Sequence, residues 1–321
     1  SIIKIEDTDA WTHLSFGKLI FEQKSLPQTE PFAYPSIGKP ITHQSWLFQL
    51  IFYISYHLFD IYGVILLKAI IITTAFYILL KDSLMPFKNY AISVFVMSII
   101  AFIARHRFVE RPDIFLMVFL PFTVYALNAF VYEGKKYIYS LPIISLLWAN
   151  SHVSIVLIFI PFGSFLAGGI IQNLLSKRFS GLQPEITFSK AKVIGAIFLA
   201  AFVLSFINPV SLSSSLTVQY TSGGQVIFSD WWKQEISELK SPTWQTYKAP
   251  FILTGVVILS FLLNWVSAFL RRKRISHPLP NLYHLLLILP FIYLSFTAVR
   301  FIFLLGIVAG PIIARNFSSL L

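Results

Sequence analysis

The chain has 321 residues, of which 56% are hydrophobic and only 12% are charged, and its mean hydropathy is +0.73. A soluble domain carries roughly a quarter charged residues and shows amphipathic periods, so these values exclude an ordinary soluble protein. The formal charge of +11 comes from short Lys and Arg clusters between apolar runs, a pattern that indicates membrane orientation and excludes a nucleic-acid-binding stripe. The absence of cysteine excludes disulfides and thiolate metal sites.

The first part of the chain is predicted to form an external domain. Residues 1–45 are polar and rich in Pro and Gly, which indicates a folded segment outside the membrane. The apolar run 46–58 is shorter than the roughly 17–25 residues that a spanning helix needs, so it predicts an interfacial or re-entrant helix. The external domain, with its interfacial helices, is therefore expected over 1–61. If 46–58 were instead a true span, the N-terminal segment would lie inside.

About nine transmembrane helices are predicted over 62–321. Unsatisfied backbone groups are costly in hydrocarbon, and the apolar runs lack the alternation of barrel strands, so the fold class is all-α and polytopic. The longest connection, the external loop 209–249, is expected to form a structured cap that contains Trp231, Trp232 and Trp244. The expected spans are 62–80, 89–104, 112–131, 138–150, 153–172, 192–208, 250–270, 281–297 and 300–315.

Basic residues in alternate loops predict the orientation. By the positive-inside rule these loops are cytoplasmic, so the other loops face outward and the protein is expected to be a multi-pass protein of the plasma (inner) membrane. The outward loop 105–111 is an exception because it is itself basic. The residues that carry the signal are Lys81, Lys88, Lys135, Lys136, Lys177, Arg178, Lys190, Lys192 and Arg271, Arg272, Lys273 and Arg274.

Asp7 and Asp9 are the candidate catalytic residues. Carboxylates at this spacing can hold a divalent cation such as Mg²⁺ or Mn²⁺, or serve as a base and its orienting partner. The structural alternative is that they cap a helix expected over 10–21, which explains Asp9 well and leaves Asp7 without a role.

The other outward-facing polar residues are candidates for binding substrate. Arginines clustered in one loop suit a phosphate or pyrophosphate because guanidinium groups make bidentate contacts with such anions, although contacts with lipid headgroups are an alternative. An arginine that interrupts an apolar run is a functional candidate by default. For the polar residues in tight turns, the alternative is an ordinary turn or loop residue. The predicted substrate-binding residues are His43, Arg105, Arg107, Arg111, Asn150, His152, Glu238 and Arg300.

A series of short motifs resembles the GT-C glycosyltransferases, in particular a bacterial group related to the mannosyl- and aminoarabinose-transferring branch. The resemblance implies a catalytic Asp7 or Asp9 in the first external loop, an interfacial helix over 46–58, and a polyprenyl-phosphate sugar donor that enters from the lipid. That family has a transmembrane helix before its acidic motif, so we expect one to precede Ser1. The motifs are Asp7-x-Asp9-x-Trp11 followed by Gly17, His43-x-x-Trp46-Leu47, Arg111-Pro112, Leu147-Trp148-Ala149-Asn150-x-His152, Asn208-Pro209 and Glu238-x-x-Ser241-Pro242.

The expected function is transfer of a sugar from a polyprenyl-phosphate donor to an acceptor on the outer face. Asp7 or Asp9 would be the general base or a metal ligand, and the arginines would neutralise the departing lipid phosphate. The alternatives are a lipid-linked sugar flippase or a non-catalytic subunit that binds other membrane subunits. An ion-coupled transporter is disfavoured because the predicted spans have almost no ionisable residues. The expected partners are the donor and membrane lipids, and nucleic acid is excluded.

Overall fold

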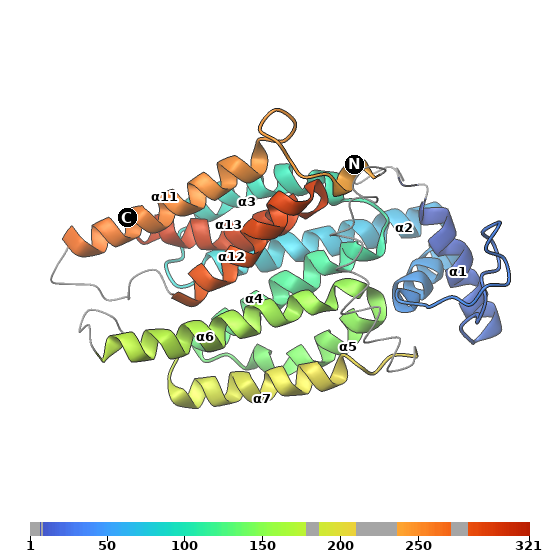
Figure 1. Ribbon diagram of the computed structural model, residues 1–321, viewed down its shortest axis with the longest axis horizontal. Helices are drawn as coiled ribbons and strands as arrows, with labels where there is room; N and C mark the ends of the chain where they lie inside the picture. The colour runs from blue at the N-terminus through green and yellow to red at the C-terminus, as the bar shows by residue number, and fades with distance from the viewer. Residues whose placement is uncertain (1–6, 8, 178–185, 210–235, 271–281) are drawn as a thin grey trace.

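The computed structural model describes residues 7, 9–177, 186–209, 236–270 and 282–321, and every regular element in these ranges is a helix. The all-α prediction is therefore confirmed. The helices form an elongated bundle in which most neighbours run antiparallel (Figure 1). In chain order they are α1 (Asp9–Gln23), α2 (Trp46–Ser83), α3 (Tyr90–Ala104), α4 (Leu116–Glu133), α5 (Leu141–Ser151), α6 (Phe159–Ser176), α7 (Phe188–Leu204), α11 (Ala249–Leu270), α12 (Leu282–Thr297) and α13 (Ile302–Ser318).

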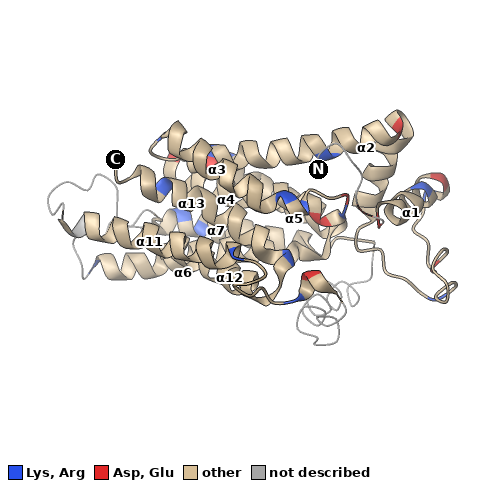
Figure 2. Cartoon of the chain, turned by 90° about the horizontal axis from the view of Figure 1, so that it is seen from above, with Lys and Arg blue, Asp and Glu red and all other residues tan. Residues whose placement is uncertain are grey.

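Six helical stretches of the described residues are long and apolar enough to cross a membrane, so the chain is a membrane-embedded protein. Most of the length of the long helices carries no charged side chain (Figure 2). Helices also occupy the other predicted ranges, but α5, α7 and α12 are shorter, so the prediction of about nine spans is not confirmed. The six stretches are Trp46–Ser83, Tyr90–Arg107, Pro112–Glu133, Val153–Ser176, Ala249–Ser267 and Val299–Ser318.

Helix α2 consists of two helical parts that meet at a sharp kink. Phe59 and Asp60 have non-helical backbone angles, and the φ of Asp60 is +53°. The break falls where the sequence predicted the boundary between an interfacial helix and the first span. Gly63 makes the turn possible, because a Cβ at this position would lie 1.9 Å from the carbonyl oxygen of Ser55. The first part of α2 therefore packs against the start of the second part.

Helix α1 packs against the first part of α2, and together they lie across one end of the bundle (Figure 1). Gly17 lies at the contact, where a Cβ would come within 2.1 Å of the carbonyl oxygen of Gln49 and 2.6 Å of the Cβ of Tyr53. Only glycine allows this approach of the two helices. The pair brings the N-terminal carboxylates to the end of the bundle, which we call the site end.

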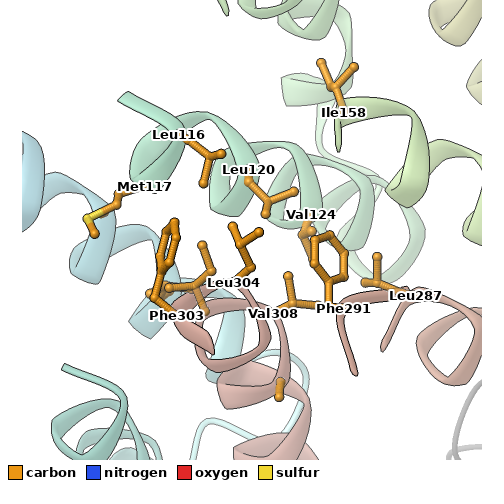
Figure 3. Packing of buried hydrophobic residues seen from close by; sticks show 14 of the residues in the cluster. Leu116, Met117, Leu120, Val124, Ile158, Leu287, Phe291, Phe303, Leu304 and Val308 are labelled. Carbon is orange, nitrogen blue, oxygen red and sulfur yellow. The ribbon is translucent and has the colours of Figure 1, made fainter. Parts of the chain in front are cut away.

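Helix α13 is the centre of the bundle, since nearly all of its residues are buried. Leu304 and Val308 of α13 face Leu120 of α4 and Phe291 of α12 (Figure 3), and all four side chains are almost fully buried. Such close packing disfavours changes of volume by even one methylene group.

A second polar cluster lies at the opposite end of the bundle. The Arg315 guanidinium donates to the carbonyl oxygens of Met85 at 2.7 Å and Asp82 at 2.9 Å, and to the Asp82 carboxylate at 3.2 Å. It also lies 2.8 Å from Nε2 of His284, and Asn128 donates to the Asp82 carboxylate at 2.8 Å. This cluster connects α2, α4, α12 and α13, and the sequence prediction did not include it.

Only part of the predicted cap over 209–249 can be compared with the structure. Trp231 and Trp232 lie outside the described residues. The described part contains a short 3₁₀ helix, η6 (Ser237–Leu239), followed by Trp244, which is exposed and packs edge-on against Phe251 of α11.

Candidate functional site

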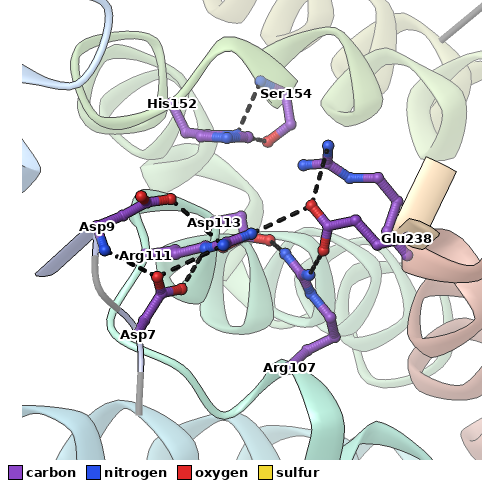
Figure 4. Close-up of polar contacts among 9 residues, drawn as sticks. Asp7, Asp9, Arg107, Arg111, Asp113, His152, Ser154 and Glu238 are labelled. Carbon is purple, nitrogen blue, oxygen red and sulfur yellow. Dashed lines mark hydrogen bonds and ion pairs between the residues drawn. The ribbon is translucent and has the colours of Figure 1, made fainter. Parts of the chain in front are cut away.

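Charged side chains from four separate stretches of the chain converge at the site end. They come from the N-terminus of α1, from the connection between α3 and α4, from η6, and from η7 (Val299–Phe301). Figure 4 shows most of them around one centre. The charged cluster consists of the carboxylates Asp7, Asp9, Asp113 and Glu238 and the guanidinium groups of Arg107, Arg111 and Arg300.

Arg111 is the hub of the charged cluster. It forms an ion pair with Asp7, lies 3.3 Å from Oδ2 of Asp9, and donates to Oε1 of Glu238 at 3.1 Å. Burial acts to lower the pKa of Arg111, but hydrogen bonding and charge from Asp7, with the charges of Glu238 and Asp9, raise it overall. Arg111 therefore joins the N-terminal segment to the η6 segment.

The two predicted catalytic carboxylates are brought together, but they differ in environment. Asp7 is nearly buried, and its oxygens accept from the backbone N–H of Asp9 at 2.9 Å and from Arg111. The helix-start contact is therefore made by Asp7, whereas the capping alternative had assigned it to Asp9. Asp9 is the first residue of α1, and its side chain is 58% exposed. Asp9 is the carboxylate that a substrate can approach.

The remaining ion pairs fix Arg107 and Glu238. Arg107 forms an ion pair with Asp113 and donates to Oε2 of Glu238 at 2.8 Å, and Nη1 of Arg300 lies 3.8 Å from Oε1 of Glu238. The η6 segment is itself attached to η7, because the N–H of Val299 donates to the carbonyl oxygen of Lys240 at 3.0 Å. Glu238, for which a plain loop role was an alternative, therefore bridges three arginines.

A buried ion pair positions the loop that carries Arg107 and Arg111. Lys68, two turns into the second part of α2, pairs with Glu110, and both side chains are almost completely buried. Because a buried pair of charges requires close matching of its partners, it fixes the loop against α2. Neither residue was among the predicted site residues, although Lys68 is an ionisable residue inside an apolar run and so a functional candidate.

His152 ends α5 at the edge of the charged cluster. Its Nδ1 faces the hydroxyl of Ser154 at 2.7 Å and accepts from the N–H of Ser154 at 3.1 Å, which caps the 3₁₀ helix η4 (Val153–Ile158). Burial lowers the pKa of His152 to about 4, because the opposing attraction of Asp113 is countered by Arg300. His152 is therefore neutral near pH 7.

The structure leaves two predicted site residues engaged elsewhere. His43 contacts the carbonyl oxygen of Pro27 through Nε2 and packs edge-on against Phe16, so it belongs to the core of the N-terminal segment. Asn150 accepts from Nε1 of Trp46 at 2.8 Å and donates to two backbone carbonyl oxygens. Through these bonds, the side-chain amide of Asn150 connects α5 with α2.

Two residues at the site end were not among the predicted site residues. Asp113 follows the Arg111-Pro112 motif directly, and its ion pair with Arg107 could have been suspected from its place in the loop. His13 lies one turn after Asp9 on α1, and Gln49 Nε2 approaches its Nδ1 at 3.3 Å. Burial lowers the pKa of His13 in spite of the opposing charges of Asp9 and Asp7.

The predicted phosphate ligands Arg107 and Arg111 are occupied by carboxylates. Four carboxylates face three guanidinium groups, so the charged cluster has a formal excess of negative charge. Arg105 differs, since it has no carboxylate partner among the described residues and its guanidinium lies 3.9 Å from the centre of the Phe102 ring. A phosphate would therefore bind Arg105 at a lower cost in free energy than Arg107 or Arg111, because it need not displace a carboxylate.

An apolar groove of about 720 Å³ runs between α3 and α11, with α13 as its floor. Phe95, Ile99 and Ile103 line its α3 side. Phe102, which Arg105 covers, lies seven residues after Phe95 and so on the same side of α3. Arg105, an exposed residue two positions after the lining residue Ile103, follows directly at the site end of α3.

A divalent cation at Asp7 and Asp9 finds no support in this arrangement. Both residues face Arg111, and the oxygens of Asp7 already accept hydrogen bonds. Within the described ranges, no group of three His, Asp or Glu side chains is arranged to hold a metal ion.

Comparison of the chain with protein-family models, with curated proteins and with solved structures finds no match.

Replacing Arg111 with Ala is expected to release α1 from the bundle end, because three carboxylates lose their shared partner. Hydrogen exchange of residues 9–23 should rise at least tenfold in the full chain, which reports local opening of this segment. Arg105→Ala removes an arginine of the same loop that has no carboxylate partner among the described residues, and it should leave this exchange unchanged. Equal exchange in both variants would contradict the role of Arg111 as hub.

Proposed function

We propose that this protein transfers a sugar from a polyprenyl-phosphate donor to an acceptor hydroxyl on the outer side of the membrane. One observation carries the proposal: an exposed carboxylate, Asp9, lies near Arg111 at the end of a membrane-embedded bundle, and an apolar groove follows α3 toward the connection that carries Arg105 and Arg111. Such a site suits a substrate with a long apolar chain and a phosphate headgroup. The resemblance to the GT-C glycosyltransferases supports the same reaction class.

The orientation follows from the positive-inside rule. Connections at the end opposite to the site end carry several lysines, which favours a cytoplasmic location for that end. The site end then faces outward, where a carrier lipid presents its sugar. The described residues that support this assignment are Lys81, Lys88, Lys135, Lys136, Lys190 and Lys192.

In the proposed reaction, Asp9 is the general base. It accepts the proton of the acceptor hydroxyl while the hydroxyl oxygen attacks the anomeric carbon, and the bond between that carbon and the phosphate oxygen of the lipid breaks. The lipid phosphate leaves with the electron pair, and Arg105 and Arg300 stabilise its charge. Direct displacement inverts the configuration at the anomeric carbon. Asp7 holds Arg111 and the start of α1 in place.

The groove is the proposed path of the lipid chain. It is lined by apolar side chains of α3, α11 and α13, and it is open along one side. An isoprenoid chain that lies in it would bring its phosphate to the site end. The assignment predicts that a tryptophan placed in the groove reduces retention of the lipid, whereas a tryptophan on an exposed surface outside the groove does not.

Mass spectrometry of copurified lipids, combined with a transfer assay, tests the proposal. The wild-type protein should retain a polyprenyl-phosphate species, and Ile99→Trp, which fills the groove, should reduce it severalfold. Ile70→Trp is the matched control because Ile70 is a similarly exposed residue of α2 that does not line the groove. Asp9→Asn should keep the lipid and lose about 10²–10⁴-fold in transfer rate.

Three outcomes would overturn the proposal. Full transfer activity of Asp9→Asn would remove the general base. Retention of bulk phospholipid alone would remove the donor class. Retention of a polyprenyl phosphate that is moved across the membrane without sugar transfer would favour the flippase alternative.

A further inference from the structure

The contacts of His152 define which of its ring nitrogens carries the proton. The indole N–H of Trp148, a fully buried side chain, can only donate, and it donates to the Ser154 hydroxyl oxygen at 3.0 Å. The hydroxyl hydrogen of Ser154 is then free to point at Nδ1 of His152, 2.7 Å away. The N–H of Ser154 donates to the same nitrogen at 3.1 Å. Two donors therefore face Nδ1, which must be the unprotonated nitrogen of the ring.

The other nitrogen, Nε2, then carries a hydrogen. No hydrogen bond connects Nε2 to any residue that the structure describes. The charges of Asp113, Arg300 and Arg107 act on the pKa of His152, so its ring lies near the charged cluster. In Figure 4 the dashed lines from His152 run to Ser154, and its imidazole lies apart from the ion pairs of Arg111 and Asp7. The ring thus has one hydrogen-bond donor left near the cluster, and it adds no charge.

Asp113 offers the complementary group. Its Oδ1 is buried and has no hydrogen-bond partner among the described residues, while Oδ2 is paired with Arg107. Buried acceptors without partners are rare in folded proteins, and such a group at a site suggests that a ligand completes it. A hydroxyl group can satisfy both residues, since it donates one hydrogen and accepts another. The excess of carboxylates in the charged cluster disfavours an additional anion at this position.

We propose that His152 and Asp113 form a subsite for a sugar hydroxyl, in which Nε2–H of His152 donates to the hydroxyl oxygen and Oδ1 of Asp113 accepts its hydrogen. Ser154 is the positioning residue that selects this form of the ring. The inference rests on the proposed function for the identity of the ligand as a sugar. The protonation pattern of the ring stands independently of it. A neutral donor is compatible with the surrounding carboxylates and does not compete with Asp9 for the proton of the acceptor.

Nitrogen NMR of the full chain in nanodiscs tests the ring directly. With ¹⁵N-labelled histidine, and with His152→Gln to identify its signals, Nε2 should be protonated and Nδ1 unprotonated, without titration between about pH 5 and 8. Ser154→Ala should add a population with the proton on Nδ1, and Ser154→Thr, which keeps the hydroxyl, should restore the wild-type spectrum. A proton on Nδ1 in the wild type, or titration near pH 6.5, would overturn the assignment.

Synthetic polyprenyl-phosphate glucose and mannose test the ligand. Either probe should shift the Nε2 signal of His152, and His152→Phe should lower kcat/KM about ten- to a hundredfold. His152→Gln, whose amide places a donor near the position of Nε2, should lose less than His152→Phe. An unchanged Nε2 signal with both probes, or equal losses for Gln and Phe, would overturn the subsite. Absence of transfer by the wild type together with a shifted Nε2 signal would instead overturn the transferase and support the hydroxyl subsite.

Discussion

Replacing Glu110 with Gln is expected to destabilise the protein by about 3–5 kcal/mol, the range for breaking a buried ion pair by neutralising one partner. The side chains of Lys68 and Glu110 are only 2% and 0% exposed, so solvent cannot replace the lost interaction. Lys68→Met should have an effect of similar size, because it leaves the carboxylate of Glu110 in an apolar environment. The free energy of unfolding, measured by titration with SDS, reports both changes.

The double variant distinguishes a charge effect from a loss of packing. Lys68→Met combined with Glu110→Gln removes both charges, and its stability should lie closer to the wild type than either single variant does. The exposed pair of Lys18 and Glu22 on α1, 3.8 Å apart, is the matched control, and its disruption should cost less than about 1 kcal/mol. Additive losses in the double variant would show that the charges do not interact. Because Glu110 lies in the loop of Arg107 and Arg111, the proposed sugar transfer should fall in the single variants as well.

Arg315→Met should also destabilise the protein by about 3–5 kcal/mol, through the polar cluster at the opposite end. The substitution keeps an apolar stem of similar length but leaves the carboxylate of Asp82, whose side chain is 2% exposed, without its guanidinium. It also removes a donor to the carbonyl oxygen of Met85 in the connection between α2 and α3. Stability should be measured by the same SDS titration.

Neutralising the carboxylate should compensate in part. Asp82→Asn in the Arg315→Met background is expected to recover some of the lost stability, whereas the backbone contacts of Arg315 stay lost. Lys192→Met, which removes an exposed cation of α7 that lies over the ring of Phe188, should change stability by less than about 0.5 kcal/mol. If Arg315→Met matched this surface control, the cluster would have no structural role.

Local sequence signals predicted the helical fold and the break in α2. Apolar runs and their lengths separated 46–58 from the span that follows, because a membrane imposes a minimum helix length. The close approach at Gly17 and Gly63 could not be predicted, since it depends on which helices pack together. The lengths of α5, α7 and α12 depend on where the connections before and after them begin, which apolar runs alone do not define.

The composition of the charged cluster was predicted better than its connections. Successive loops of a membrane protein lie on alternate sides of the bilayer, and this rule placed Asp9, Arg111 and Glu238 on one side. The rule requires no knowledge of how the helices pack. Which carboxylate pairs with which arginine depends on rotamers and loop geometry, so the occupancy of Arg111 by three carboxylates was not foreseen. His43 and Asn150 show the converse. A polar residue of a motif can serve packing within its own segment, as His43 does, or between two helices, as Asn150 does, and only contacts reveal this.

The ion pairs of Arg111 can all form only late in the synthesis of the chain. Its carboxylate partners come from the start of the chain and from Glu238, which is synthesised more than a hundred residues later. A growing chain that has inserted only its first helices has Arg107 and Arg111 without Glu238. The site end therefore becomes electrostatically complete only after η6 has been made and has docked on η7. A protein that is cut short before this segment would have the helices of a membrane protein and no assembled site.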